Sequence, residues 1–180
     1  MSALNIQHSF LFRFAMNQDV LAIFTAGVAA CLGMDAWQQI LKRFTGIPAT
    51  NWAMVGRWFT LTLQRRTMYH PTIDNEAPVA NELPLGWVVH YLVSMLYAVI
   101  YWLLIQASII QPTLADGFIF GAASVVVPWF YFMPCMGKGV MGKLTPNPMK
   151  ACLVSLSSHL VYGTAMGVGF MLFESFFSSV

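Results

Sequence analysis

The sequence has 180 residues, of which 58% are hydrophobic and only 9% are charged. Such a composition leaves too few polar side chains to cover a water-facing surface, and it excludes a soluble domain. The net charge of +2 is small, and the basic residues are dispersed rather than gathered in a run or on one helical face, which argues against nucleic-acid binding. Three cysteines without CxxC spacing indicate neither a disulfide framework nor a zinc ribbon.

Four long apolar runs predict an all-α membrane protein, a bundle of four transmembrane helices forming one integral membrane domain over residues 1–180. Each run has about 20 residues or more, enough to cross roughly 30 Å of hydrocarbon at 1.5 Å per residue. The expected spans are residues 20–41, 86–110, 114–133 and 151–177.

The connection between the first two spans, residues 42–85, is too long for a simple turn and mixes aromatic residues with arginines. We expect Thr50 or Asn51 to cap a short amphipathic helix lying on the membrane surface, with Trp52 and Trp58 on its side at headgroup level. An extended return to the second span is then favoured by three prolines, Pro71, Pro78 and Pro84.

Eight of the nine basic residues lie in two connections, between spans one and two and between spans three and four. The positive-inside rule makes both connections cytoplasmic, which places both termini outside. Only Arg13 lies elsewhere. A lipoprotein-type cleavage before Cys31 is a competing interpretation, but it would place the basic residues of the first connection outside.

Apart from Asp116 and Glu174 near the outer ends, the acidic and histidine side chains within the spans are three, all in the predicted cytoplasmic half: Asp35, His90 and His159. Such groups are costly in lipid, so we expect them to face the interior of the bundle. Helical spacing places further polar residues on the same faces, so the stripes of spans two and four should face each other. These stripes are His90, Ser94, Tyr97 and Tyr101 on span two, and Ser155, His159 and Tyr162 on span four.

This polar cluster has three interpretations. The side chains fix helix register by hydrogen bonding alone; or Asp35, His90 and His159 hold a divalent metal, for which carboxylate and imidazole are usual ligands; or the two histidines hold haem b. A polar small molecule is an alternative ligand. The predicted ligand-binding set also includes Tyr97 and Tyr162 and, from the cytoplasmic connection, Arg57, His70 and Glu82.

Glycines four residues apart occur on the third and fourth spans, where this spacing lets helices approach closely. The pairs are Gly117 with Gly121 and Gly163 with Gly167. They predict either packing within the bundle or contacts in a homo-oligomer, in addition to contact with the lipid bilayer.

Several separated motifs resemble an uncharacterised family of bacterial inner-membrane proteins, classed as a domain of unknown function. They are Met34 to Trp37, Asn51 to Trp58, Gly86 to Tyr91, Pro112 to Leu114, Pro134 to Gly139, Thr145 to Pro148 and Ser155 to Gly163. The resemblance covers the chain from Ala26 onward and implies no reaction. A histidine expected in the family after the Gly-Arg-Trp motif is replaced by Thr60, Leu61 and Thr62, which weakens any scheme that needs another ligand there.

These observations lead us to expect a multi-pass inner-membrane protein that binds a metal ion or a polar small ligand in a cleft facing the cytoplasm. One alternative is a small oligomeric transporter or proton-coupled permease, in which Asp35 and the histidines relay protons. Another is an interfacial enzyme acting on a lipid-linked substrate, although the sequence contains no diagnostic catalytic motif.

Overall fold

The computed structural model describes the backbone of residues 3–177 and the side chains of residues 18–177. Within this range the chain is helical and has no strands, as predicted. Four helical segments are long and apolar enough to cross a membrane: Gln18–Thr45, Glu82–Gln106, Leu114–Cys135 and Pro148–Phe177. Arg13, predicted to lie outside, falls beyond the described side chains.

The elements follow one another as α1 (Ala3–Thr45), α2 (Trp52–Arg65), η1 (Ile73–Asn75), α3 (Glu82–Gln106), α4 (Leu114–Ser124), η2 (Pro128–Phe132), α5 (Met133–Cys135), η3 (Val140–Gly142) and α6 (Pro148–Phe177). The second span begins at Glu82, one turn before the predicted position, because Pro84 lies in the first turn of α3, where a helix needs no N–H donor. It ends at Gln106 rather than at residue 110.

The third span is interrupted near its middle. Pro128 has no N–H and cannot continue the α-helical ladder, and the chain from Pro128 to Phe132 winds as a π-helix before α5. The span therefore widens at η2, and Pro128 and Phe132 border a cavity described below.

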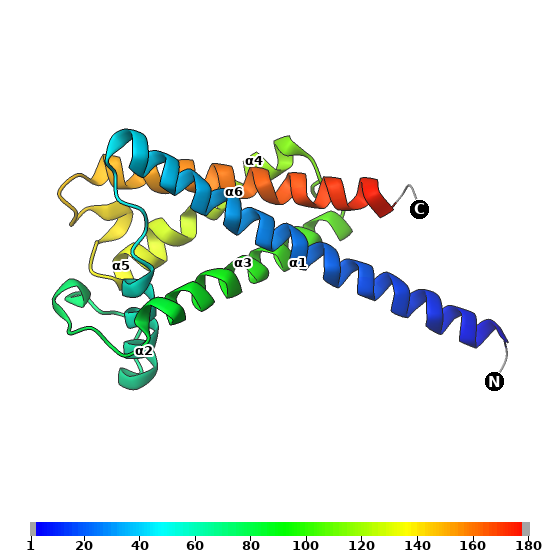
Figure 1. The fold of residues 1–180 in the computed structure, drawn as a ribbon, viewed down its shortest axis with the longest axis horizontal. Coiled ribbons are helices and arrows are strands. Elements are labelled where there is room, and N and C mark those ends of the chain that lie inside the picture. Colours follow the sequence, from blue (N-terminus) through cyan, green and yellow to red (C-terminus); the bar gives the residue numbers. More distant parts are fainter. Residues whose placement is uncertain (1–2, 178–180) are drawn as a thin grey trace.

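Figure 1 shows the spans crossing in one bundle, with both ends of the chain and the α3–α4 connection at the same end. The connections that carry α2, η1 and η3 gather at the opposite end. We call the first the terminal end and the second the α2 end.

Small residues hold the spans together. Alanines of α1 lie buried against α6, and a Cβ added to Gly169 would come 2.9 Å from Ala26 Cα. On α4 and α6, a Cβ at Gly163 would overlap backbone atoms of Gly117 and Gly121. Gly117, Gly121 and Gly163 thus serve packing within one chain, as does Gly167. These close contacts agree with the predicted packing within the bundle, and an oligomer contact through the same glycines stays a prediction.

α2 packs against the bundle. Its N-cap is Asn51, whose side chain accepts a hydrogen bond from Met54 N at 3.2 Å. Gly56 lies directly against the backbone of Glu82 in α3. The aromatic side of α2 was expected at headgroup level, but Trp52 stacks on His90, and Trp58 is buried with ring contacts to Tyr131 and Phe132.

Candidate functional site

A cavity of about 320 Å³ lies among the spans at the α2 end and is bordered by all four of them and by α2. Most of its lining is apolar, including Met34, Val55, Phe132, Met133 and Val154. Its polar lining includes His90, Ser94, Tyr97, Ser158, His159 and Tyr162. This combination of an apolar wall with a few polar groups is typical of small-molecule sites. We call it the main cavity.

The two predicted polar stripes meet across the main cavity, which confirms that part of the prediction. Ser94 Oγ on α3 lies 3.0 Å from Tyr162 OH on α6, and the rings of Tyr97 and Tyr162 are 6.0 Å apart between centroids. Ser94 Oγ donates its only hydrogen to the Gly27 carbonyl at 2.8 Å. Tyr162 must therefore be the donor to Ser94, so its hydroxyl hydrogen is also committed.

The tautomer of His159 follows from the same kind of reasoning. Ser124 Oγ donates to the Gly121 carbonyl at 2.8 Å, so towards His159 Nδ1, also at 2.8 Å, it can only accept. Nδ1 therefore carries the proton, and in the neutral ring Nε2 has a free lone pair. Because His159 lines the main cavity, a hydrogen-bond acceptor is available on the cavity wall.

His90 also lines the main cavity, but its Nε2 lies beside Asp35. Its Nε2 lies 3.3 Å from Asp35 Oδ1, but the two groups are not aligned as a hydrogen bond, and Nε2 has no hydrogen-bond partner among the described residues. The ring of Trp52 stacks on the imidazole at 3.9 Å between centroids. His90 is 8% exposed and Asp35 is 19% exposed.

The predicted metal site is not assembled. Asp35 and His90 are neighbours, but His159 is tied to Ser124, and the described residues contain no group of three or more His, Cys, Asp or Glu side chains that could hold a metal ion. His90 and His159 line the same cavity, but the contacts of their ring nitrogens differ, with Asp35 beside the first and Ser124 beside the second. For haem b, the geometry gives no support, since His90 Nε2 faces Asp35.

Arg57 and Glu82 also belong to the predicted ligand set, but they bind each other. Arg57 Nε and Nη2 donate to Glu82 Oε2 and Oε1 at 2.8 and 3.0 Å, and Nη1 donates to the Glu76 carbonyl at 2.8 Å. The hydrogen bond to Glu82 raises the pKa of Arg57. Glu82 also accepts from Val79 N at 3.0 Å. This pair joins α2 to α3, and its part in ligand binding stays a prediction.

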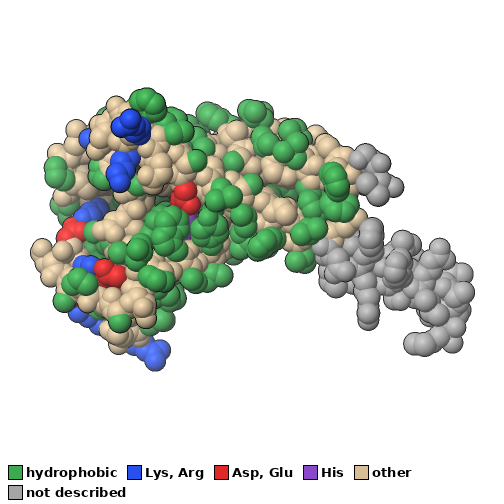
Figure 2. Space-filling view, viewed as in Figure 1, with side chains coloured by type: hydrophobic (Ala, Val, Ile, Leu, Met, Phe, Trp, Pro, Cys, Tyr) green, Lys and Arg blue, Asp and Glu red, His purple; other side chains and the backbone are tan. Residues whose placement is uncertain are grey.

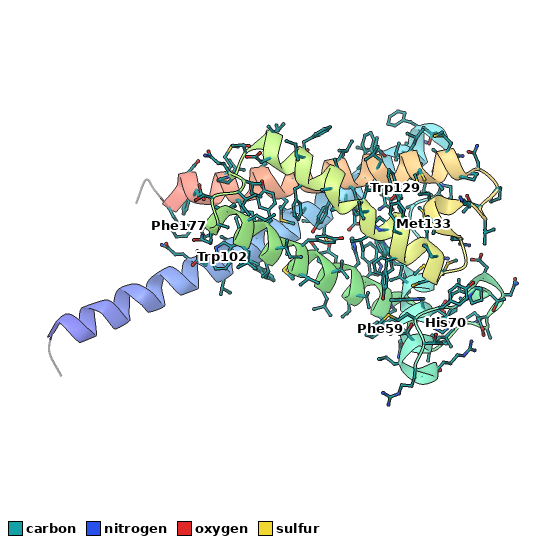
Figure 3. All side chains as sticks on the ribbon, turned by 180° about the vertical axis from the view of Figure 1, so that it is seen from behind. Phe59, His70, Trp102, Trp129, Met133 and Phe177 are labelled. Carbon is teal, nitrogen blue, oxygen red and sulfur yellow. The ribbon has the colours of Figure 1, made fainter. Side chains whose placement is uncertain are left out.

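His70 lies apart from the main cavity, at the α2 end (Figure 3). Its backbone N–H donates to the Cys135 carbonyl at 2.7 Å, and its Nε2 is 3.3 Å from the Thr62 hydroxyl. It is buried near Ile73, which belongs to a small cluster with Trp58 and Leu61. His70 therefore fastens the connection after α2 to α5 and lines neither cavity, and its part in ligand binding stays a prediction.

A second cavity, also of about 320 Å³, lies between α1, the start of α2 and the start of α3. Its lining includes Asp35, Gln38, Thr50, Trp52 and Trp87. Thr50 and Trp52 border both cavities. Sequence reasoning missed Gln38, Trp52 and Trp87 as site residues, although an amide one helical turn after Asp35 in an apolar span is a signal that could have identified Gln38.

Figure 2 shows one face of this end of the molecule, with an acidic side chain directly beside a histidine among hydrophobic ones. Among the described residues, Asp35 and His90 form the one carboxylate–imidazole pair within ion-pair distance. Asp35, which borders the second cavity, is partly exposed at 19%.

Comparison with known proteins places the chain in a family but gives it no activity. No curated protein and no solved structure shows significant similarity to it. Residues 24–172 match the family described as a protein of unknown function, DUF2938. This match includes the second and third spans entirely and all of the first and fourth except residues 18–23 and 173–177. The chain is therefore a multi-pass membrane protein that belongs to the DUF2938 family.

Proposed function

We propose that this protein binds a small, largely apolar molecule that carries a hydrogen-bond donor, such as a hydroxyl group, in the main cavity. The observation that carries the proposal is the His159–Ser124–Gly121 chain of hydrogen bonds, which leaves His159 Nε2 as an acceptor on the wall of an otherwise mostly apolar space. An apolar body would fill the cavity, and its donor group would bond to Nε2.

Other polar groups of the cavity lining also favour a ligand that carries a hydrogen-bond donor. Ser158 Oγ donates to the Val154 carbonyl at 2.9 Å, and Tyr162 donates to Ser94, so both can only accept from a ligand. Among the described residues, the hydroxyls of Tyr97 and Ser155 have no hydrogen-bond partner and are available in either role. The sequence suggested a polar or metallic ligand; the apolar lining favours a molecule that is mostly hydrocarbon.

We favour binding over the transporter and enzyme hypotheses because His159 has one ring nitrogen committed to Ser124 and lines a cavity whose walls are mostly apolar. A proton relay would need a chain of titratable groups leading away from His159. Its ring neighbour is Tyr162, whose hydroxyl is bonded to Ser94.

We propose further that the α2 end faces the cytoplasm of a bacterial cell. Lys and Arg side chains gather at this end in Figure 2, in agreement with the positive-inside rule. Alkaline phosphatase fused after Val180 should then be active, because the carboxyl terminus would lie in the periplasm. An inactive but stably produced fusion after Val180, together with an active fusion after Gly142, would show that the orientation is the opposite of the one proposed.

The binding proposal can be tested with 1-naphthol and 1-methoxynaphthalene, which differ in whether the oxygen can donate. For protein in lipid nanodiscs, near-saturating 1-naphthol should raise the midpoint of thermal unfolding by about 3 °C. 1-Methoxynaphthalene should raise it less, because it leaves the acceptor of His159 unpaired.

Two variants localise the effect. Val154→Trp fills the main cavity and should abolish the shift, whereas Val99→Trp, on a partly exposed position of α3 away from the cavity, should keep it. Equal shifts with both compounds, or an unchanged shift in Val154→Trp, would mean that the compounds act through the lipid and that the proposal is wrong.

A further inference from the structure

The second cavity contains polar groups that the protein itself leaves unsatisfied. The Asp35 carboxylate accepts no hydrogen bond from any described residue, and its one close polar contact is the misaligned His90 Nε2 at 3.3 Å. No described Lys or Arg lies within ion-pair distance of it. A carboxylate inside a span without a donor is costly unless a ligand supplies one.

Gln38 has an unpaired hydrogen-bond donor, whereas Asp35 has unpaired acceptors. It is 5% exposed, and its Oε1 accepts a hydrogen bond from Thr50 N at 2.7 Å. This bond fixes the orientation of the amide, because a backbone N–H requires an oxygen. The Nε2 group is therefore a buried donor, and it has no partner among the described residues. Gln38 lies one helical turn from Asp35, about 4.5 Å along the axis of α1.

Two indole rings complete the cavity. The centroids of Trp52 and Trp87 are 5.6 Å apart, with the ring planes inclined by 45°. Both rings border the same cavity as Asp35. Indole faces carry negative electrostatic potential and attract cations, and the attraction is stronger where water is partly excluded.

We propose that the second cavity binds a primary ammonium group with an oxygen acceptor two carbons away, the chemistry of ethanolamine. The ammonium would donate to Asp35 beside Trp52 and Trp87, and the oxygen would accept from Gln38 Nε2. This site is separate from the main cavity, and its ligand is different. The same chemistry is carried by a soluble amino alcohol and by the head group of an aminophospholipid, and the cavity adjoins the helix ends where head groups lie.

The test uses protein in nanodiscs of phosphatidylglycerol, which has no amine. Binding of ethanolamine, ethylamine and ethylene glycol is measured by calorimetric titration. Ethanolamine should bind at least tenfold more tightly than ethylene glycol, which lacks the cation, and several-fold more tightly than ethylamine, which lacks the oxygen.

Variants assign these differences to residues. Asp35→Asn should weaken ethanolamine binding at least tenfold, and Gln38→Leu should make ethanolamine and ethylamine bind equally. Trp87→Leu, which leaves both hydrogen bonds in place, should weaken the binding of both amines several-fold. It provides the test of the site if Asp35→Asn does not fold. Val154→Trp in the main cavity should leave amine binding unchanged, so that failure of one site is distinguishable from failure of the other.

The source of the ligand is determined by adding phosphatidylethanolamine to the nanodiscs. Loss of ethanolamine binding would identify the lipid head group, and unchanged binding would identify a soluble amine; either result supports the site. Ethanolamine binding no tighter than that of ethylene glycol, or equal binding by the wild type, Asp35→Asn and Trp87→Leu, would overturn the proposal.

Discussion

The two ends of the bundle are built differently. At the terminal end, small residues bring helices together and large side chains fill the remaining space: Tyr101 and Met166 are fully buried, and Tyr101 stacks on Phe170 at 5.4 Å. At the α2 end the spans leave room for both cavities, and α2 is joined to them by the Arg57–Glu82 pair. The terminal end is filled by packed side chains, whereas the α2 end combines close backbone contacts at Gly56 and Gly86 with polar contacts and leaves both cavities.

The largest effect in this comparison should come from the glycines that join α4 to α6. Gly163→Ala places a methyl group against backbone atoms of Gly117 and Gly121, which can only separate by moving whole helices. We expect a loss of about 2–3 kcal/mol in the free energy of unfolding, measured by steric trapping.

Gly27→Ala is the matched control. Its new Cβ would meet the Met95 side chain at 2.5 Å from Cε, a flexible group that can move aside. The loss should be about 1 kcal/mol or less. If the two substitutions cost the same, tight backbone contact is not what holds the packed part of the bundle.

A smaller effect is expected from the polar contacts of the α2 end. Arg57→Leu removes the guanidinium donors of the Glu82 carboxylate, which keeps only Val79 N, and of the Glu76 carbonyl, and we expect a loss of about 1 kcal/mol. Arg57→Lys should recover little of this, because an ammonium cannot form the two parallel bonds that a guanidinium makes. Full recovery by lysine, in the same unfolding assay, would show that charge alone joins α2 to α3.

The smallest effect concerns the exposed pair of Arg65 and Glu76. Arg65 donates to both Glu76 oxygens at 2.7 and 2.9 Å and lowers the pKa of Glu76 below its ordinary value of 4.5. A lowered carboxyl pKa stabilises the folded state above the unfolded pKa, and this contribution disappears as the pH falls through the folded pKa.

Glu76→Gln should therefore lose slightly less stability than the wild type when the pH is lowered from about 5 to about 3. Thermal unfolding across this range checks the difference, and Arg65→Leu should give the same flatter profile. A steeper profile in either variant would contradict the assigned role of the pair.

The membrane architecture could be predicted from the sequence because apolar length is a local property. The four spans appear where the apolar runs lie, and their ends differ by a few residues where capping and Pro84 decide the boundary. The facing polar stripes of α3 and α6 could also be predicted, since helical spacing fixes which side chains share a face.

The site itself could be predicted only in part. Sequence spacing says nothing of how helices rotate about their axes, so it placed His159 with Asp35 although its Nδ1 bonds to Ser124. The path of residues 46–81 depends on contacts between distant segments, such as His70 N with the Cys135 carbonyl. Trp52 was expected at the membrane surface because an aromatic residue at a helix start has the same local pattern whether it faces lipid or a cavity.

The central claim is that the main cavity presents a bare nitrogen of His159 to its ligand. Nitrogen-15 NMR of histidine-labelled protein in nanodiscs reports the protonation of each ring nitrogen, with the His159 signals identified by their loss in His159→Gln. We predict a protonated Nδ1 and an unprotonated Nε2, whose signal moves on addition of 1-naphthol and stays in place with 1-methoxynaphthalene. A protonated Nε2, or a signal that 1-naphthol leaves unchanged, would contradict the account.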